Sequence, residues 1–252
     1  GASVLVVGAG ALGGPVALYL AAAGVGRLGI ADGDRVAVSN LQRQVLHFTP
    51  DVGVQKAHSA AAKLRFLNPG IIVEPYPADL DAGNARAMVA GQDVVVDCSD
   101  TFATRALVNA ACCAEGVALV EGGAVGLEGL VLTVQPGESA CYRCAFPADP
   151  SGPSCAEAGV LGPVAGIVGS IQAVEAVKTA KRRYYQLLED KLRLPESGPF
   201  SVETHQGAFR DWQKYLRRLL NEAIAKGCLG YNQEAWSWAT RATPESRTSF
   251  GE

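Results

Sequence analysis

The sequence lacks several features that would place it in common protein classes. Among its 252 residues, no apolar run is long enough, and free enough of glycine, to span a bilayer, and no signal peptide is visible. The 22 basic residues do not exceed the 25 acidic ones, which argues against nucleic acid as the main partner. The 7 cysteines form no regular framework. We therefore expect reduced thiols in a cytoplasmic enzyme rather than a disulfide scaffold.

A hydrolase signature is also missing, and no motif is specific to dehydrogenases. The 3 histidines, among them His47, have no motif context, and no Ser-His-Asp arrangement is convincing. A glycine-rich loop at Gly8–Gly13 is present, but dehydrogenases, flavoproteins and nucleotide-binding enzymes share it. A redox dinucleotide site would leave Asn40, Arg43 and Lys56 unexplained. A nicotinamide dehydrogenase is therefore a distant alternative.

Apolar strand patterns and helical patterns alternate along the chain, which is 48% hydrophobic with 29 glycines. This predicts an α/β fold, a Rossmann-like, doubly wound and mainly parallel sheet with helices on both faces. Ligands bind such sheets beyond the carboxyl ends of the strands, where Asp32, Asp97 and Asp100 fall. The predicted strands are 3–7, 27–31, 71–75, 93–97, 118–120 and 130–134, and the predicted early helices are 11–23 and 55–67.

The residues at that edge fit phosphate chemistry better than hydride transfer. Glycines in Gly8–Gly13 let the backbone approach a phosphate, and the next helix presents free N–H groups to it. Asp32 is placed to accept hydrogen bonds from ribose hydroxyls. Arg43 supplies a rigid cationic fork and Lys56 a mobile charge. Asp100 is a suitable ligand for Mg²⁺, which prefers one or two carboxylates together with phosphate oxygens.

In this order, the motifs resemble the MoeB/ThiF adenylyltransferases, bacterial relatives of the ubiquitin-activating enzymes. The resemblance runs from Ser3 to about Lys178. So many motifs in one order make a chance match very improbable. The segments that carry it are Gly8–Gly13, Asp32–Asp34, Ser39–Arg43, Lys56, Asp97–Asp100, Cys141–Cys144, Glu157–Val160 and Gly169–Ala173.

The resemblance implies a reaction and partners. Such enzymes bind Mg-ATP and the Gly-Gly tail of a small ubiquitin-like sulfur carrier of the ThiS/MoaD type. They transfer AMP to the carboxylate of the tail, and pyrophosphate leaves. A sulfur donor, such as a cysteine desulfurase or a rhodanese, then yields a thiocarboxylate. The family is usually a homodimer, so we expect a cytoplasmic homodimer that uses ATP and Mg²⁺.

Carried over by position, the resemblance assigns roles to individual residues. Asp32 would hold the ribose, Asn40, Arg43 and Lys56 would contact the phosphates, and Asp100 would organise Mg²⁺. The catalytic residues expected are Asp100, Arg43, Lys56 and Cys155. The nucleotide-binding residues expected are Gly8, Gly10, Ala11, Gly13, Asp32, Asp34, Ser39, Asn40, Leu41, Gln42, Arg43, Lys56, Asp100, Thr101 and Arg105.

Several of these residues have a plainer interpretation when taken alone. Asp34 fits a turn cap, Lys56 a solvated lysine at a helix start, and Asp100 a helix cap. Only their joint order favours the nucleotide site. Asp97 follows three valines and is interpreted as structural, whereas Glu121 is given no role.

The cysteines leave two questions open. Structural zinc in the family uses two CxxC pairs, but only Cys141 and Cys144 form one here, so the alternatives are a zinc site and a pair of free thiols. Cys155 aligns with a cysteine that in some members bonds covalently to the activated carrier. It lies before a predicted helix, which would favour the thiolate. The alternative is that Cys155 has no covalent role.

The terminal parts of the sequence depart from the family. Family members commonly carry, before the first strand, a helix with an arginine that reaches the partner's ATP, and Gly1 comes after that segment. We divide the chain into an adenylation domain, 1–178, and a largely helical C-terminal region, 179–252, which is basic and holds all 3 tryptophans. Core packing is the favoured interpretation of its apolar pattern at 209–224, and a partner-binding groove is the alternative.

Three function classes remain. The favoured one is an ATP-dependent adenylyltransferase that acts on the C-terminal carboxylate of a carrier protein. The second is an enzyme of the same fold that activates another carboxylate, in a peptide or a tRNA. The third is a catalytically silent partner subunit, suggested by the N-terminal departure.

Overall fold

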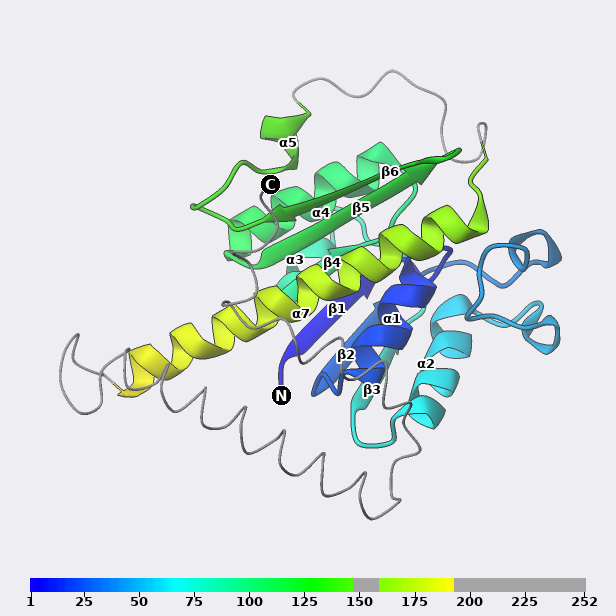
Figure 1. Ribbon diagram of the computed structural model, residues 1–252, viewed down its shortest axis with the longest axis horizontal. Coiled ribbons are helices and arrows are strands. Elements are labelled where there is room, and N and C mark those ends of the chain that lie inside the picture. Colours follow the sequence, from blue (N-terminus) through cyan, green and yellow to red (C-terminus); the bar gives the residue numbers. More distant parts are fainter. Residues whose placement is uncertain (147–158, 193–252) are drawn as a thin grey trace, which may run out of the picture. The chain divides into compact units, whose positions relative to one another are not determined.

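A six-stranded sheet organises residues 1–146 and 159–192, which are the residues that this computed structural model describes (Figure 1). The strand order is β3-β2-β1-β4-β5-β6, and every neighbouring pair is parallel except β5 and β6. This confirms the predicted mainly parallel sheet. The strands are β1 (Ser3–Val7), β2 (Arg27–Ala31), β3 (Ile72–Tyr76), β4 (Val94–Asp97), β5 (Ala118–Val125) and β6 (Glu128–Val134).

Helices cover both faces of the sheet, as predicted. On one face, α1, α2 and α7 share a hydrophobic cluster with the sheet, and on the other α3 and α4 form a second cluster. The helices α1 to α4 each connect one strand to the next parallel strand, from β1 to β5. Because these four connections lie on both faces of the sheet, the fold is doubly wound. The helices are α1 (Gly13–Ala22), α2 (Lys56–Leu67), α3 (Ala85–Val89), α4 (Phe102–Glu115), α5 (Tyr142–Ala145) and α7 (Gly162–Leu192), with short 3-10 turns η1 (Val38–Asn40) and η2 (Thr49–Asp51).

Successive side chains of β4 alternate between the two faces of the sheet and so contact different helices. Val94 and Val96 belong to the cluster under α1 and α7, and Val95 belongs to the cluster under α4. Alternation along a strand puts Asp97 on the same face as Val95. Its cross-strand partner on β5 is Glu121. Two carboxyl groups therefore enter the α4 side of the core together.

The site of a ligand follows from the strand order. β1 and β4 are adjacent and in register, with Val7 paired to Asp97. The helices that follow them, α1 and α4, lie on opposite faces of the sheet. The two connecting loops therefore diverge at the carboxyl ends of these strands, which is where doubly wound sheets bind ligands.

The structure extends some predicted elements. β5 and β6 are longer than predicted and form an antiparallel hairpin in which Val125 pairs with Glu128. Gly126 adopts a left-handed φ of 58°, which a tight two-residue turn requires. The helix α7 is observed to Leu192, where the described residues end. The pattern at 209–224 lies outside the described residues.

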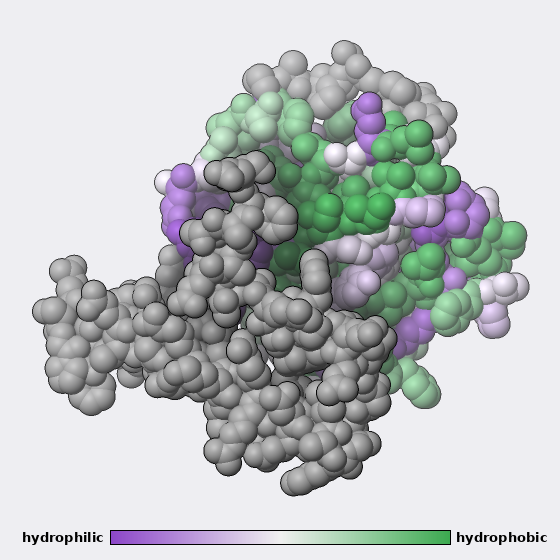
Figure 2. Space-filling view, in the orientation of Figure 1, coloured by the Kyte–Doolittle hydropathy of each residue, from purple (hydrophilic) through white to green (hydrophobic). Residues whose placement is uncertain are grey.

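The outer side of α7 carries apolar side chains at helical spacing. Ile167, Ile171 and Val174 are 61%, 46% and 59% exposed, respectively. Figure 2, which views the molecule from the α7 side, shows hydrophobic residues gathered over this face. In the described part of the chain, no helix is long and apolar enough to cross a membrane.

The first turn of α1 is pressed against the glycine loop, which gives a test of the packing. A Cβ added at Gly13 would lie 1.8 Å from the carbonyl oxygen of Gly8, whereas one at Gly10 would meet only the Gln44 amide, at 3.5 Å. We expect Gly13→Ala to lower the free energy of unfolding by about 1–3 kcal/mol, because backbone atoms must move apart. Urea denaturation of both variants measures this. Gly10→Ala is the matched control and should change stability by less than about 0.5 kcal/mol. Equal effects of the two substitutions would contradict the packing argument.

Candidate active site

A pocket of about 450 Å³ opens at the carboxyl ends of β1, β2 and β4. Its wall combines backbone of the glycine loop with side chains of both charges. Many of the residues predicted to bind the nucleotide lie on this wall. They are Gly8, Gly10, Ala11, Asp32, Asp34, Arg43, Lys56, Asp100, Thr101 and Arg105.

The glycine loop is held at the peptide groups of Ala9. The Asp32 Oδ2 atom accepts a hydrogen bond from the Ala9 N–H at 2.8 Å. The Ala9 carbonyl lies 2.8 Å from Nε2 of His47. Gly8 has a φ of 93°, a left-handed conformation that glycine adopts without strain. Both the N–H and the carbonyl of Ala9 are thus held by hydrogen bonds, and the backbone of the loop is exposed to the pocket.

His47 is a residue that the sequence analysis left without a role. Its side chain is buried, its Nδ1 lies 2.8 Å from the Ser59 hydroxyl, and its Nε2 faces a carbonyl that only accepts. Nε2 therefore carries a proton and donates to that carbonyl, and we assign the ring as neutral, with Ser59 donating to Nδ1. Burial lowers the pKa of His47 from its usual 6.5, which agrees with this assignment. No sequence motif announces this contact, because it joins residues 38 positions apart.

Lys56 is not the solvated lysine that a helix start alone would suggest. Its side chain is only 7% exposed, and its Nζ lies 2.7 Å from the Asp34 carboxylate. Asp34 therefore pairs with Lys56 rather than capping a turn. Asp32 lies beside them, and burial raises its pKa while the charge of Lys56 opposes that rise. One cation thus faces two carboxylates on the wall of the pocket.

Asp100 is exposed at the start of α4, but it does not cap that helix. Thr101 is the N-cap, and its side chain accepts a hydrogen bond from the Thr104 N–H at 3.2 Å. Within residues 1–146 and 159–192, no hydrogen bond or ion pair of the Asp100 carboxylate is found. An exposed carboxylate of this kind is chemically suited to a hard cation such as Mg²⁺.

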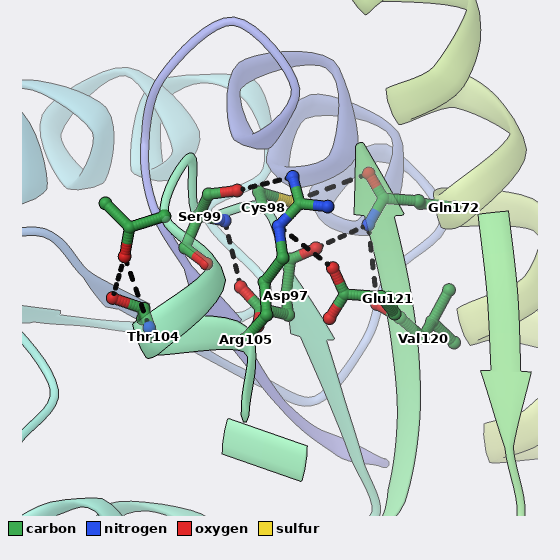
Figure 3. A network of polar contacts seen from close by, with 9 residues as sticks. Asp97, Cys98, Ser99, Thr104, Arg105, Val120, Glu121 and Gln172 are labelled. Carbon is green, nitrogen blue, oxygen red and sulfur yellow. Dashed lines mark hydrogen bonds and ion pairs between the residues drawn. The ribbon is translucent and has the colours of Figure 1, made fainter. Parts of the chain in front are cut away.

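Arg105 reaches the pocket from α4 through a buried polar network (Figure 3). It donates to the carbonyl oxygen of Ser99 at 3.0 Å, and its Nε lies 3.4 Å from the Glu121 carboxyl group. Asp97 and Glu121 are both fully buried. From α7, the Gln172 amide donates to the Asp97 carbonyl oxygen at 2.8 Å. The sequence analysis gave Glu121 no role, although an acidic residue in an apolar strand was the available signal.

Some of the predicted residues lie away from the wall of the pocket. Gly13 is packed against Gly8 inside α1. Segment 39–42 forms the turn before Arg43, in which the Ser39 carbonyl accepts from the Arg43 guanidinium at 3.2 Å. Gly13 and segment 39–42 are therefore not among the residues that line the pocket. The lining residues that the sequence analysis missed include Gln44, Asp79, Leu80, Ser99, Thr104, Ala124 and Val160.

The CxxC pair lies at the start of α5, outside this pocket. The sulfur atoms of Cys141 and Cys144 are 3.6 Å apart. Their surroundings lower the pKa of Cys141 to about 7, chiefly through the Cys144 N–H. Zinc needs four ligands, and the described residues hold no group of three metal-binding side chains. The described part of the chain does not form a zinc site, and Cys155 lies outside it.

The adenylation motifs, the doubly wound sheet and the pocket point to one family. Residues 1–207 match the model of the ThiF family. The chain belongs to the ThiF family. The resemblance to MoeB/ThiF enzymes that the motifs carried is thereby confirmed.

Curated relatives match a little over half of the chain. The SAMP-activating enzyme E1 of Haloferax volcanii is 54% identical over 144 residues, which cover 57% of this chain and 53% of the relative. The sulfur carrier protein adenylyltransferase of Thermus thermophilus is 50% identical over 151 residues, covering 58% and 56%. The chain thus spans about half the length of these relatives.

Solved structures show the same fold. The crystal structure of E. coli MccB with ATP superposes with a TM-score of 0.64 and 24% identity, covering 72% of this chain and 56% of that one. At this identity the likeness shows the fold alone.

The neutral His47 predicts a specific pH dependence of stability. Burial lowers its pKa in the folded state, so below about pH 6.5 the unfolded chain binds a proton there that the folded chain does not. Stability should therefore fall as the pH drops from 6.5 towards the pKa of the folded state. His47→Gln keeps a donor for the Ala9 carbonyl and should lose this component, as measured by denaturation between about pH 5 and about pH 7.5. His58→Gln, which changes an exposed histidine on α2, should keep the wild-type slope; if His47→Gln also keeps it, the assignment of the neutral ring is wrong.

Thiol reactivity should separate Cys141 from Cys113. The pKa of Cys141 is lowered to about 7, whereas burial raises the pKa of Cys113, which lies on α4. After treatment with a chelator, we expect iodoacetamide at neutral pH to alkylate Cys141 at least about tenfold faster than Cys113. Peptide mass spectrometry over time measures the ratio. Equal rates would show that the Cys144 N–H does not stabilise a Cys141 thiolate.

Proposed function

We propose that the chain is an ATP-dependent adenylyltransferase that activates the C-terminal Gly-Gly carboxylate of a small ubiquitin-like sulfur-carrier protein. One observation carries the proposal. A glycine loop, three cationic side chains and the carboxylate of Asp100, which has no partner among the described residues, converge on one pocket at the switch point of the sheet. A triphosphate whose charge grows during cleavage needs these groups together, whereas a hydride-transfer site does not.

The geometry of the loop supports ATP as a substrate. The Gly8 φ of 93° and the hydrogen bonds of Ala9 hold the loop so that its backbone is exposed to the pocket. Phosphate oxygens can therefore approach the backbone closely. Asp32 borders this loop at the end of β2, where a carboxylate accepts from ribose hydroxyls. Both Asp32 oxygens already accept backbone hydrogen bonds, from Ala9 and Asp34, which orients the carboxylate.

Charge on the wall supports cleavage between the α- and β-phosphates. Lys56 and Arg43 would hold the phosphates and stabilise the negative charge that develops on the leaving pyrophosphate. Asp100 would hold Mg²⁺, which supplies charge neutralisation on the phosphates. The carrier carboxylate would attack the α-phosphorus, so that an acyl–AMP bond forms as the bond to pyrophosphate breaks.

The names of the relatives support the identity of the substrate. The Haloferax relative is named as an activating enzyme and the Thermus relative as an adenylyltransferase for a sulfur carrier. We propose a carrier of the ThiS/MoaD type. A sulfur donor, such as a cysteine desulfurase or a rhodanese, would then convert the acyl-adenylate to a thiocarboxylate.

Assembly and compartment belong to the same proposal. The exposed apolar side chains on α7, at Ile167, Ile171 and Val174, are suited to an interface between two copies of the chain. Within the described residues, Cys98, Cys112, Cys113, Cys141 and Cys144 are free thiols, which fits a reducing cytoplasm.

The proposal is tested by exchange of labelled pyrophosphate into ATP with a panel of carriers that end in Gly-Gly. We expect exchange that depends on a carrier. Asp100→Ala should lower exchange by at least about 100-fold, because the charge that organises Mg²⁺ is lost. Glu128→Gln is the matched control, since it removes an exposed carboxylate on β6 that is not part of the pocket lining.

Two results would count against the proposal. Absence of exchange with every carrier, despite ATP binding measured by calorimetry, would favour another carboxylate substrate or a silent subunit. Equal loss in Asp100→Ala and Glu128→Gln would show that Asp100 has no special part in the reaction.

A further inference from the structure

The carboxyl groups of Asp97 and Glu121 form a buried pair whose hydrogen bonding is incomplete. The two residues are cross-strand partners, Asp97 at the end of β4 and Glu121 within β5, and both are fully buried. Asp97 accepts one hydrogen bond, from the Ser99 N–H at 2.9 Å, through Oδ1. Its Oδ2 and both carboxyl oxygens of Glu121 have no hydrogen-bond partner among the described residues.

Two ionised carboxylates cannot satisfy these oxygens. Carboxylates only accept, so neighbouring carboxylates leave each other unpaired and repel in a medium that screens charge weakly. A proton on one of the two carboxyl groups changes both the hydrogen bonding and the repulsion. The protonated group donates to the other, and the repulsion between like charges disappears.

The charges around the pair also favour one proton on the two carboxyl groups. Arg105 is the cation beside it, with its Nε 3.4 Å from Glu121. One proton makes the carboxyl pair singly negative, so that pair and guanidinium sum to zero. The other titratable groups that face the pair are thiols and a phenol, which are neutral when protonated. Among the described residues they are Cys98 directly after β4, Cys112 on α4 and Tyr142 on α5.

Arg105 is confined as tightly as the pair. A Cβ on Gly123 would lie 2.5 Å from the Nη1 atom of Arg105, so a larger residue at this position would displace the guanidinium. The guanidinium carbon also lies 5.8 Å from the ring centre of Phe102. The side chain nevertheless borders the nucleotide pocket. Its direction is therefore set by contacts behind the pocket wall.

We propose that Asp97 and Glu121 share one proton, with Glu121 as the donor, and that this singly charged pair is a positioning device that holds Arg105 towards the pocket. Asp97 keeps the negative charge, since it already accepts from the Ser99 N–H. The effect on catalysis rests on the proposed adenylation, whereas the shared proton does not. Burial and the neighbouring Asp97 charge raise the pKa of Glu121 to about 10, in keeping with a protonated Glu121 at neutral pH.

Infrared spectroscopy of the full chain tests the proton directly. At neutral pH we expect a C=O stretch from a protonated carboxylic acid that shifts in deuterium oxide. The band should vanish in Glu121→Gln, which has no acid to protonate. It should also vanish in Asp97→Asn, because Glu121 then lacks an anionic neighbour and ionises as the partner of Arg105. Asp97→Asn is informative even where Glu121→Gln folds poorly.

Kinetics test the positioning role through the pyrophosphate exchange. Glu121→Gln keeps both the charge count and a donor to Asp97, so kcat and KM for ATP should stay within about threefold of the wild type. Asp97→Asn retains one carboxylate and should behave similarly. The double variant leaves Arg105 without a counter-charge, and we expect KM for ATP to rise by about tenfold or more, beyond the product of the single effects.

The outcomes separate this inference from the proposed function. A wild-type spectrum without the band, or a band that persists in Glu121→Gln, would overturn the shared proton. If each single variant raised KM for ATP as much as the double variant does, one negative charge would not be sufficient to hold Arg105. That result would overturn the proposed charge balance between the carboxyl pair and Arg105. Loss of stability without any change in KM would assign the pair to folding alone. If the wild type shows no exchange at all, the spectra still decide the proton, and KM is replaced by the dissociation constant of ATP.

Discussion

The site depends on the restraint of the Ala9 peptide groups. Asp32 accepts from the N–H of Ala9, and the neutral His47 donates to its carbonyl. Asp32 comes from β2 and His47 from the segment before α2, so the loop after β1 is tied to two later parts of the chain. A glycine loop is intrinsically free to adopt many conformations. These two hydrogen bonds restrict the loop to the conformation in which its backbone is exposed to the pocket.

Charges at the site are of two kinds. Lys56 and Arg105 are buried and held by carboxyl groups, at Asp34 and Glu121. Asp100 is exposed, and no partner for it is found in the described part of the chain. Buried cations with fixed partners need little rearrangement when a ligand binds, which is the condition for electrostatic stabilisation. An open carboxylate is the complementary feature that a metal-bound ligand needs.

The sequence predicted what local patterns encode. The sheet, the covering of both faces and the residues that line the pocket, such as Asp32, Lys56 and Asp100, followed from apolar periodicity and ordered motifs. Contacts between distant residues were not predicted. His47 reaches Ala9 and Glu121 reaches Arg105 through the fold, and no spacing rule connects those positions. The interpretation of Asp97 as structural also missed that its carboxyl group has an acidic partner on the next strand.

Gln172 gives α7 a consequence for the strands beneath it. Its amide donates to the carbonyl oxygens of Asp97 and Val120, at 2.8 and 3.4 Å, and occupies the space that a Cβ on Gly122 would fill. The helix therefore cannot slide along the sheet without breaking both bonds and burying an unpaired amide. A displacement of α7 along its axis would therefore also displace Asp97 at the end of β4 and Val120 within β5. Because Cys98, the residue after Asp97, lines the pocket, the axial position of this outer helix is coupled to the shape of the pocket.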